Sequence, residues 1–230
     1  MIIEKIEVLE LELDLKKKFE HSLYKRKKTN NIIIKLYTQN NFGIGESLPR
    51  EYVTGESCES IIKTLNEKLI PDFKNIEFNN YKDLVKYIEN YLIHKIKKNE
   101  LSAFACFETA LINLMCKEFK IGIEDILNHL KISFNKKKTM KHTAIMGENN
   151  LLKQILKAQI IKHRKFNEVK IKINAKSIWK LKILRKFLKN IKIRVDANCS
   201  LSNSNIENNI DILNKTNINI IEQPFKTDDI

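Results

Sequence analysis

The chain has 230 residues with 43% hydrophobic and 30% charged content, which is typical of a globular protein large enough for one large or two modest domains. No apolar run approaches the ~18 residues that span a bilayer, and Met1–Asp14 alternates charged and aliphatic residues instead of forming a signal-peptide core, so we expect a cytoplasmic protein without membrane association. The net charge of +14 comes from lysines in nearly every predicted element, without a zinc-finger spacing or an aromatic-basic motif, and specific nucleic-acid binding is therefore not expected.

The chain opens with patterns typical of strands. Residues Ile2–Leu15 alternate aliphatic and charged side chains, but the parity of the aliphatic positions changes midway, which predicts a bulge near Val8–Leu9. A second β-rich run covers Asn31–Tyr37, and a third strand is predicted in Phe42–Pro49. Asparagine tolerates left-handed backbone angles, so Asn40–Asn41 predicts the tip of a hairpin.

The segment Lys16–Asn30, between the first two strands, is polar and strongly charged. Its composition is typical of a solvated loop. The alternative is a flap that covers a ligand, in which Phe19 and His21 would contact that ligand.

Three helical patterns follow the strands. The first has capping groups in Thr54–Ser57 and is expected to stop at Pro71, because proline lacks a backbone N–H. Three strands followed by helices predict an α+β domain, which we assign to residues 1–130. The apolar positions of the helices are Ile61, Ile62, Leu65 and Leu69; then Tyr81, Leu84, Val85, Ile88, Leu92 and Ile96; and then the small and apolar residues of Leu101–Phe119.

The four cysteines, Cys58, Cys106, Cys116 and Cys199, have no short CxxC spacing. Neither a zinc site nor a disulfide framework is therefore indicated. We expect four free thiols, two of them (Cys106 and Cys116) in the last of these helices.

From residue 131 the pattern changes. A lysine-rich connection, Lys131–Lys141, leads into strands that alternate with amphipathic helices. This alternation predicts a parallel sheet with right-handed crossovers, here an incomplete (β/α) TIM-type barrel of about four βα units in residues 131–230. The strands are predicted at His142–Met146, Val169–Asn174, Ile191–Asn198 and Ile218–Phe225, and the helices at Leu151–Ile161, Ile178–Leu188 and Asn205–Leu213.

The strand Val169–Asn174 has an unusual composition. Side chains alternate with period 2, so Lys170 and Lys172 share one face, although a parallel strand is normally apolar on both faces. The next two strands carry acids near their carboxyl ends, Asp196 and Glu222. The spacings from Lys172 onward are 196 − 172 = 24 and 222 − 196 = 26 residues, about one βα unit each. This periodicity predicts that Lys172, Asp196 and Glu222 lie on one rim, where barrel active sites are found.

The residue types on this rim suit catalysis. Two carboxylates on neighbouring strands suit a hard divalent cation, with Mg²⁺ preferred. A neighbouring ammonium or a cation disfavours the charged form of a lysine, so one of the two lysines is a candidate base. The alternative is a structural ion pair between Lys172 and Asp196 across the strands.

The residues also carry a resemblance. The motifs Lys170–Lys172, Arg194–Asn198 and Ile221–Pro224 resemble the barrel motifs of the enolase superfamily, in its muconate lactonizing enzyme subgroup. The stretches Gly43–Pro49 and Tyr52–Glu56 resemble the N-terminal capping domain of the same subgroup. The resemblance covers the chain from its first strand to its last residues and implies an enolase-like capping domain in 1–130 and the first half of an enolase-like barrel in 131–230.

The resemblance implies a mechanism. Asp196 and Glu222 would be two Mg²⁺ ligands, and Asn198 would lie beside the metal or the substrate. Lys172 would be the acid or base on one face of the substrate, and Lys170 would adjust its pKa. The metal would stabilise the enediolate that forms when the α-proton of a carboxylate is removed.

The resemblance also implies a substrate class. The capping domain, with Phe19, His21 and the segment near Pro49, would close over the site, and Thr143 is a further candidate substrate contact. Tyr52–Glu56 favours the dipeptide epimerases, which act on a small carboxylate or dipeptide. An o-succinylbenzoate synthase or a muconate cycloisomerase-type lyase is the alternative.

Some parts that the resemblance requires are missing. A third metal carboxylate belongs on a fifth strand and a second lysine on a sixth, whereas only four strands are predicted before Ile230. We therefore expect a C-terminally truncated sequence that is a fragment of a longer enzyme, with open strand edges that need cover. The alternatives are a half-barrel completed by another chain or by a homo-oligomer, and a catalytically inactive binding or assembly module.

Overall fold

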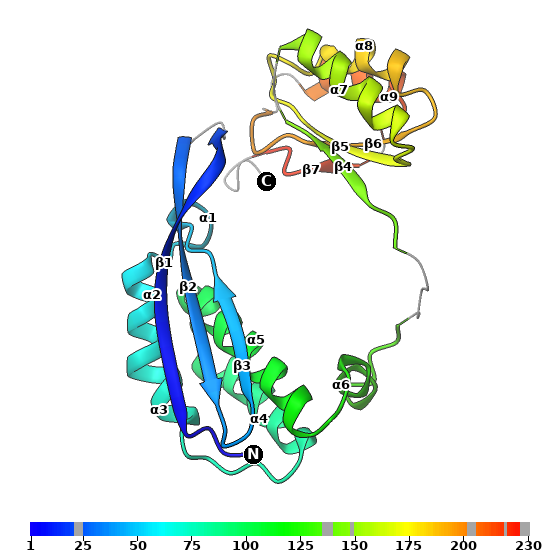
Figure 1. Cartoon of the computed structure of the whole chain (residues 1–230). Helices are drawn as coiled ribbons and strands as arrows, with labels where there is room; N and C mark the ends of the chain where they lie inside the picture. Colours follow the sequence, from blue (N-terminus) through cyan, green and yellow to red (C-terminus); the bar gives the residue numbers. More distant parts are fainter. Residues whose placement is uncertain (21–24, 135–139, 148–149, 202–205, 219, 226–230) are drawn as a thin grey trace. The chain divides into compact units, whose positions relative to one another are not determined.

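The structure is a computed structural model, which describes residues 1–20, 25–134, 140–147, 150–201, 206–218 and 220–225. The chain divides into two compact units, Met1–Asn135 (unit 1) and Lys136–Ile230 (unit 2). Unit 1 contains an antiparallel sheet and unit 2 a parallel sheet, and each sheet carries helices (Figure 1). Each unit has a hydrophobic core of its own.

The sheet of unit 1 has three antiparallel strands, β1 (Lys5–Glu20), β2 (Lys25–Tyr37) and β3 (Phe42–Ser47). The pairing of β1 with β2 is continuous through Val8–Leu9, and its register shifts only after Asp14. The predicted bulge near Val8–Leu9 is therefore wrong. From Leu9 to Asp14 both faces of β1 are exposed, so the aliphatic positions no longer follow the side that faces the core.

Most of the segment predicted as a solvated loop belongs to the two strands. Residues 16–20 extend β1 and residues 25–30 begin β2, so the loop prediction is wrong there. Polar side chains pair across the strands, since Lys28 contacts Glu12 and Asn30 Nδ2 donates to Glu10 Oε1 at 3.1 Å, and such cross-strand pairs stabilise a hairpin. Phe19 lies in β1, and His21 lies outside the described residues.

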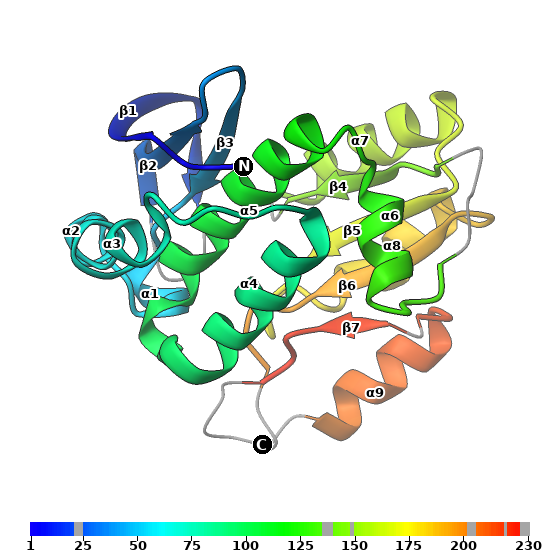
Figure 2. The ribbon, with the colours of Figure 1, turned by 90° about the horizontal axis from the view of Figure 1, so that it is seen from below.

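Thr38 and Asn41 close the β2–β3 hairpin, because Thr38 N donates to Asn41 O at 3.0 Å. The tip predicted at Asn40–Asn41 is thus confirmed. The main helices of unit 1 lie on one face of the sheet, as Figures 1 and 2 show. The helical elements are α1 (Glu51–Thr54), α2 (Cys58–Thr64), the π-helical turn η1 (Leu65–Leu69), α3 (Ile70–Phe73), α4 (Tyr81–Lys95), the 3₁₀ turn η2 (Lys98–Glu100), α5 (Leu101–Glu118) and α6 (Ile123–His129).

The first predicted helix begins as expected but does not stop at Pro71. Ser57 caps α2 by accepting a hydrogen bond from Ser60 N at 3.2 Å, which confirms the predicted cap. The chain then continues through η1 into α3, which ends at Phe73. Pro71 lies in the first turn of α3, where a missing backbone N–H is tolerated. The short helix α6 was not predicted, because seven residues give too little periodicity.

Helix α5 forms the centre of unit 1 and packs directly on β3. Gly43 and Gly45 allow this approach, since a Cβ on Gly45 would lie 1.9 Å from Cys106 O and one on Gly43 would lie 2.1 Å from Ala110 O. Phe107 of α5 and Phe73 are among the fully buried side chains of this core. The two glycines of the Gly43–Pro49 motif therefore serve helix–sheet packing.

Unit 2 is a four-stranded parallel sheet in the order β4-β5-β6-β7, as predicted. Its helices lie on one face of the sheet (Figure 1). Buried aliphatic residues such as Val169, Ile171 and Val195 face these helices. The elements are β4 (Thr143–Met146), α7 (Leu151–His163), β5 (Glu168–Lys172), α8 (Lys180–Phe187), β6 (Lys192–Asp196), α9 (Ile206–Lys215) and β7 (Ile221–Glu222).

The last strand is much shorter than the predicted Ile218–Phe225. Gln223 has a φ of 45°, and Pro224 follows it, so the extended conformation ends after Glu222. Backbone bonds nevertheless continue past the strand, because Cys199 N donates to Gln223 O at 2.7 Å and Leu201 N donates to Pro224 O at 3.0 Å. The loops after β6 and β7 are therefore held side by side.

Two further sequence predictions can be compared with the structure. The four cysteines are free thiols, as predicted, and burial raises the pKa of the Cys106 thiol to about 12. Cys106 is buried in α5, whereas Cys116 is only half-buried. Among the residues that the structure describes, no helix is long and apolar enough to cross a membrane.

Candidate active site

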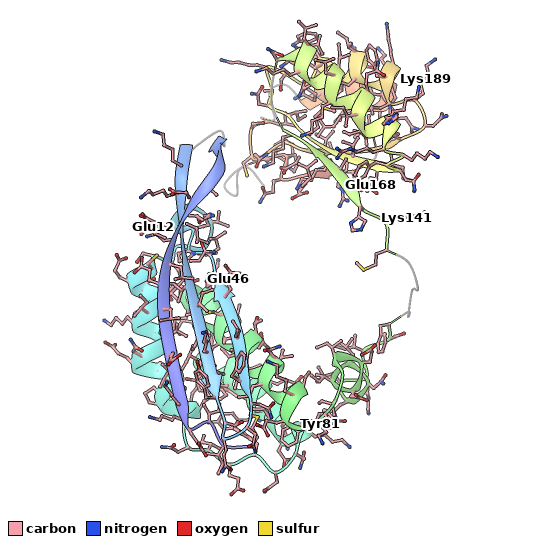
Figure 3. All side chains as sticks on the ribbon, in the orientation of Figure 1. Glu12, Glu46, Tyr81, Lys141, Glu168 and Lys189 are labelled. Atoms are coloured by element: carbon pink, nitrogen blue, oxygen red, sulfur yellow. The ribbon has the colours of Figure 1, made fainter. Side chains whose placement is uncertain are left out.

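The two lysines of β5 lie on the face of the parallel sheet that the helices do not cover. Val169 and Ile171 alternate with them and are buried under the helices, which fixes the opposite direction for Lys170 and Lys172. Figure 3 shows Glu168, the first residue of β5, on the same open side of the sheet. The face predicted to carry the chemistry is therefore a face without a covering helix layer in the described part of unit 2.

Strand register brings the predicted rim residues together. Lys172 pairs with Asp196 across β5 and β6, and Asp196 pairs with Glu222 across β6 and β7. The three residues form one row at the carboxyl ends of three neighbouring parallel strands. The spacing argument from the sequence is confirmed at this level.

Lys170 contacts both acids of this cluster. Its Nζ lies 3.0 Å from Asp196 Oδ2, 2.7 Å from Glu222 Oε2 and 2.8 Å from Glu222 Oε1. Lys172 Nζ lies 3.9 Å from Asp196 Oδ2. The ammonium group of Lys170 thus bridges two carboxylates that belong to different strands.

Burial and charge have opposite effects on Lys170. Desolvation disfavours the ammonium form, but hydrogen bonds with Glu222 and Asp196 outweigh it, and the pKa of Lys170 is raised above its ordinary value of 10.5. Asp196 is only 3% exposed, so its carboxylate depends on these partners for its charge compensation.

Asn198 follows directly after β6, next to the cluster. Its φ is 46°, a left-handed conformation that asparagine tolerates better than most residues. Its backbone N–H donates to Asp196 Oδ1 at 3.2 Å. Asn198 therefore helps to fix the Asp196 carboxylate, and its position beside the predicted metal ligands agrees with the expectation from the motif.

A second ionic group lies on the same face at the amino ends of the strands. Arg194 Nη2 contacts Glu168 Oε1, and Thr143 Oγ1 donates to the same oxygen at 3.3 Å. Thr143 is the first residue of β4 and pairs with Glu168, so the structure does not bring it to the row of Lys172 and Asp196. Glu168 was not predicted as a site residue from the sequence. The alternation that places Lys170 and Lys172 on one face also places Glu168, two residues before Lys170, on that face.

The predicted capping residues lie in unit 1. Phe19 belongs to β1, His21 lies outside the described residues, and Pro49 lines a cavity of about 380 Å³ within unit 1. Charged side chains surround this cavity, among them Glu10, Lys28, Arg50 and Glu59.

Glu56, the last residue of the Tyr52–Glu56 motif, has a structural role. Its carboxylate is 1% exposed and accepts hydrogen bonds from Ser102 N at 2.8 Å and from Ala103 N at 3.1 Å. These are free N–H groups in the first turn of α5, where a carboxylate also complements the helix dipole. The motif that suggested a substrate class is thus partly explained by helix capping.

The carboxylate pair fits a divalent cation in part. A single cationic group, the Lys170 ammonium, already contacts both Asp196 and Glu222, so one small ion can reach oxygens of both residues. Oxygen ligands of this kind are those that Mg²⁺ prefers. Among the described residues there is no group of three or more His, Cys, Asp or Glu side chains that could hold a metal ion, so this part of the chain offers two ligands.

Comparisons with curated proteins give two relatives, while no protein-family model matches the chain. The chain is 25% identical over 225 residues to an L-Ala-D/L-Glu epimerase of Francisella tularensis subsp. novicida. The match covers 95% of this chain and 60% of the epimerase. It is also 25% identical over 234 residues to an N-succinyl-L-Arg/Lys racemase of Bacillus cereus, covering 100% of this chain and 61% of the racemase. The chain therefore spans about 60% of the length of these relatives.

Solved structures agree with these relatives. The Bacillus cereus racemase superposes with a TM-score of 0.85 at 23% identity, over 100% of this chain and 61% of the racemase. A dipeptide epimerase from Enterococcus faecalis, complexed with Mg and the dipeptide L-Leu-L-Tyr, superposes with a TM-score of 0.82 at 22% identity, over 100% of this chain and 63% of the epimerase. A muconate lactonizing enzyme and a member of the enolase superfamily also match.

The likeness establishes the fold. Unit 1 corresponds to the N-terminal cap of the enolase-superfamily fold and unit 2 to part of its (β/α) barrel. The resemblance and the fold class predicted from the sequence motifs are confirmed.

Proposed function

We propose, taking the enolase-superfamily fold as the premise, that the chain is part of a Mg²⁺-dependent enzyme that removes the α-proton of a carboxylate substrate. The observation that carries the proposal is the row of Lys172, Asp196 and Glu222 at the carboxyl edge of three parallel strands, with Lys170 bridging the two acids. Barrel enzymes carry their catalytic groups at this edge. The domains would be a cap in residues 1–130 and a half-barrel in 131–230.

In this proposal the residues of the row and its neighbours have separate roles. Lys172 is the base that accepts the α-proton, because it lies at the carboxyl end of β5 in register with Asp196. Lys170 lies two residues away on the same face, and its ammonium group bridges the two acids. Asp196 and Glu222 would hold the cation, and the Asn198 backbone N–H, which donates to Asp196 Oδ1, would keep that carboxylate in place. When bound, Mg²⁺ would offset the negative charge that develops on the substrate carboxylate.

The reaction class we favour is epimerisation or racemisation of a dipeptide or an N-acyl amino acid. Its support is that the two curated relatives are an L-Ala-D/L-Glu epimerase and an N-succinyl-L-Arg/Lys racemase. A lyase of the o-succinylbenzoate synthase or muconate cycloisomerase type is the second candidate, because a muconate lactonizing enzyme shares the fold. In either case unit 1, including Phe19, His21 and the segment near Pro49, would close over the substrate.

We further propose that other polypeptide covers unit 2, either a complementing barrel half or a second copy. Three observations support this. The outer strands of the sheet are β4 and β7, Ile145 of β4 is exposed on the open face, and α7 exposes Leu152, Leu156 and Ile160 at a spacing of four residues. Such a stripe is typical of a helix that packs against a neighbour. The catalytically inactive binding or assembly module remains the competing function.

Proton exchange tests the proposed reaction. The 230-residue chain, and a longer polypeptide that includes it where one is encoded, is incubated with Mg²⁺ in deuterated water with dipeptides, N-succinyl amino acids and o-succinylbenzoate precursors. Incorporation of deuterium at the α-carbon, detected by mass spectrometry, supports the proposal. Lys172→Ala is expected to lower the rate by at least about 100-fold, the contribution of a positioned base.

The matched control is Lys192→Ala, a lysine on the neighbouring strand at the opposite end of the sheet. It should leave the exchange rate unchanged. If no substrate in the panel exchanges its α-proton in either polypeptide, the enzymatic proposal is wrong and the inactive module is the better account.

A further inference from the structure

The positive charge of the chain is concentrated in unit 2. Residues 136–230 contain 21 lysines and arginines and 8 aspartates and glutamates, a net charge of 21 − 8 = +13. Residues 1–135 contain 21 and 20, a net charge of 21 − 20 = +1. Such an asymmetry between two parts of a chain is typical of a protein that binds a polyanion.

Four exposed lysines of unit 2 lie at the amino end of its parallel sheet, where the helices finish and the strands begin. Lys162 is in the last turn of α7, Lys186 is in the last turn of α8, Lys189 follows α8, and Lys192 is the first residue of β6. Figure 3 shows Lys189 at the surface of unit 2. We call these four residues the basic edge. The row of the candidate active site lies at the opposite, carboxyl ends of the strands.

Two neighbouring cavities connect the lysines of the basic edge. One, of about 280 Å³, is lined by Lys162, Lys186 and Lys189. The other, of about 390 Å³, is lined by Lys189 and Lys192, so that Lys189 belongs to both. None of the described residues that line either cavity is acidic. The basic edge is therefore a continuous surface with charge of one sign.

The contacts within unit 2 do not account for these lysines. In its described part, the ion pairs are made by other cations, namely Lys170, Lys172, Arg194 and Lys215. Arg185 donates to the backbone carbonyls of Leu188 and Ile191 at this end of the sheet. A lysine in the last turn of a helix complements the helix dipole, but Lys189 and Lys192 lie beyond the helices. The basic edge thus has charge available for an external partner.

We propose that the basic edge is a docking surface for the phosphodiester backbone of nucleic acid, a role beyond the proposed reaction. Lysine contacts a phosphate as a point charge and does not read a base, so the binding is independent of sequence. The chain has no zinc-finger spacing or aromatic-basic motif that would read bases, which agrees with such binding.

An anionic bilayer also attracts lysines, but the surroundings of the basic edge fit it less well. Binding in a membrane interface buries apolar side chains as well as placing cations near the head groups. Among the described residues that line the two cavities, only Ile220 is large, apolar and exposed. Charge complementarity without an apolar face favours a hydrated phosphate backbone.

Binding of the 230-residue chain to a fluorescently labelled DNA duplex tests the proposal, with anisotropy measured over a series of NaCl concentrations. The unmodified chain is expected to bind with a Kd of about 10⁻⁵ M at physiological salt and more weakly as salt rises. Glutamine at all four positions of the basic edge should weaken binding at least about tenfold at about 50 mM NaCl. It should also make the slope of log K against log[NaCl] shallower by about 3, because nearly one counterion is released per phosphate contact.

The matched control carries glutamine at four other exposed lysines of unit 2, which are Lys153, Lys157, Lys176 and Lys182. They lie in the first two turns of α7, in the connection after β5 and in the first turn of α8, away from the basic edge. The control has the same net charge as the first variant, and its affinity should change by less than about threefold, because these lysines are not expected to contact the duplex. An equal loss in the two fourfold variants overturns the proposal, since the charge of unit 2 as a whole would then account for the binding.

Two further measurements complete the test. Fluorescence of Trp179 in unit 2 checks that the variants are folded. If the fourfold variant of the basic edge is unfolded, the double variant Lys189→Gln, Lys192→Gln replaces it and should weaken binding at least about threefold. Absence of duplex binding by the unmodified chain at about 50 mM NaCl overturns the proposal. Binding to phosphatidylcholine vesicles that contain phosphatidylserine, without binding to the duplex, assigns the basic edge to membranes and overturns it too.

Discussion

The two units differ in how they use the faces of their sheets. In unit 1 the helices pack so closely on β3 that Gly43 and Gly45 leave no room for a Cβ. In unit 2 the helices also cover one face, but the other face carries Lys170, Arg194 and Asp196, with ionic contacts in place of a second apolar layer. Unit 1 thus has its helices packed closely on its sheet, whereas unit 2 has an apolar core on one face of its sheet and ionic side chains on the other.

The difference shows where function can be sought in such a fold. A parallel strand is normally apolar on both faces, because elements cover it on both sides. Side chains such as Lys170 and Asp196 are retained on a strand only where partners or a ligand compensate their charge. Unit 2 therefore carries titratable side chains on one face of its sheet. In unit 1, by contrast, a buried polar group such as Glu56 accepts hydrogen bonds from the backbone of the same unit.

The aromatic residues allow the two units to be followed separately. The single tryptophan, Trp179, lies in unit 2, while all six tyrosines lie in unit 1. Tryptophan fluorescence thus reports the unfolding of unit 2, and the near-ultraviolet circular dichroism of tyrosine reports that of unit 1. Each substitution below has a unit in which it should act and a unit that serves as its control.

Gly45→Ala should have the largest effect on stability. The added Cβ would lie 1.9 Å from Cys106 O and 2.9 Å from Ala110 N, backbone atoms that cannot rotate away. Overpacking of a tight core costs about 3 kcal/mol, so the tyrosine signal should unfold at much lower urea. Gly55→Ala provides the comparison, because an added Cβ would meet open space there and only the left-handed φ of 76° disfavours alanine. An unchanged tyrosine midpoint in Gly45→Ala would contradict the packing account.

Glu56→Ala is expected to rank next. It removes the acceptor for Ser102 N and Ala103 N and leaves these two donors unsatisfied at the start of α5, the second of them buried. The cost should be about 2 kcal/mol, the usual penalty for unsatisfied buried groups at a lost cap. Glu59→Ala, on the exposed start of α2, is the matched control and should cost far less. Equal losses in the two variants would rule out the capping role.

Much of the fold was predictable from residue patterns, and the site in part. Alternation and spacing placed Lys172, Asp196 and Glu222 in one row, because strand register depends on local periodicity. The bridging position of Lys170 was not predictable, since it depends on where a flexible side chain finds two carboxylates. Thr143 was expected to contact the substrate. It is the first residue of the short strand β4 and therefore lies at the amino end of the sheet, away from the row at the carboxyl ends. The long polar hairpin was missed because cross-strand pairs, and no apolar pattern, extend it.

Arg185→Met should act in unit 2 alone. Its guanidinium donates to four backbone carbonyls, those of Thr216 at 2.7 Å, Ile191 at 2.9 Å, Leu188 at 3.1 Å and Asn217 at 3.3 Å. These carbonyls follow α8 and α9, so the side chain ties both helix ends to the amino end of the sheet. Because the substitution leaves these carbonyls without their charged donor, we expect a loss of about 1.5 kcal/mol. The tryptophan midpoint should shift while the tyrosine midpoint stays, and a shift of both would contradict the separation of the units.

The smallest expected effect is a dependence of unit 1 on acid. Hydrogen bonds from Lys95 and Tyr91 hold the pKa of Asp72 below its ordinary value of 3.8, despite the opposing effect of desolvation. A carboxyl with a lowered folded-state pKa stabilises the fold above its unfolded pKa, and this contribution is lost as the pH falls through the folded value. Because Asp72 and Lys95 are partly exposed, solvent screening limits the contribution to about 0.5 kcal/mol. Asp72→Asn should therefore lower the tyrosine midpoint at pH 6, and the difference should shrink as the pH falls below the ordinary value of 3.8. A difference that stays constant as the pH falls would assign the role of Asp72 to packing rather than to charge.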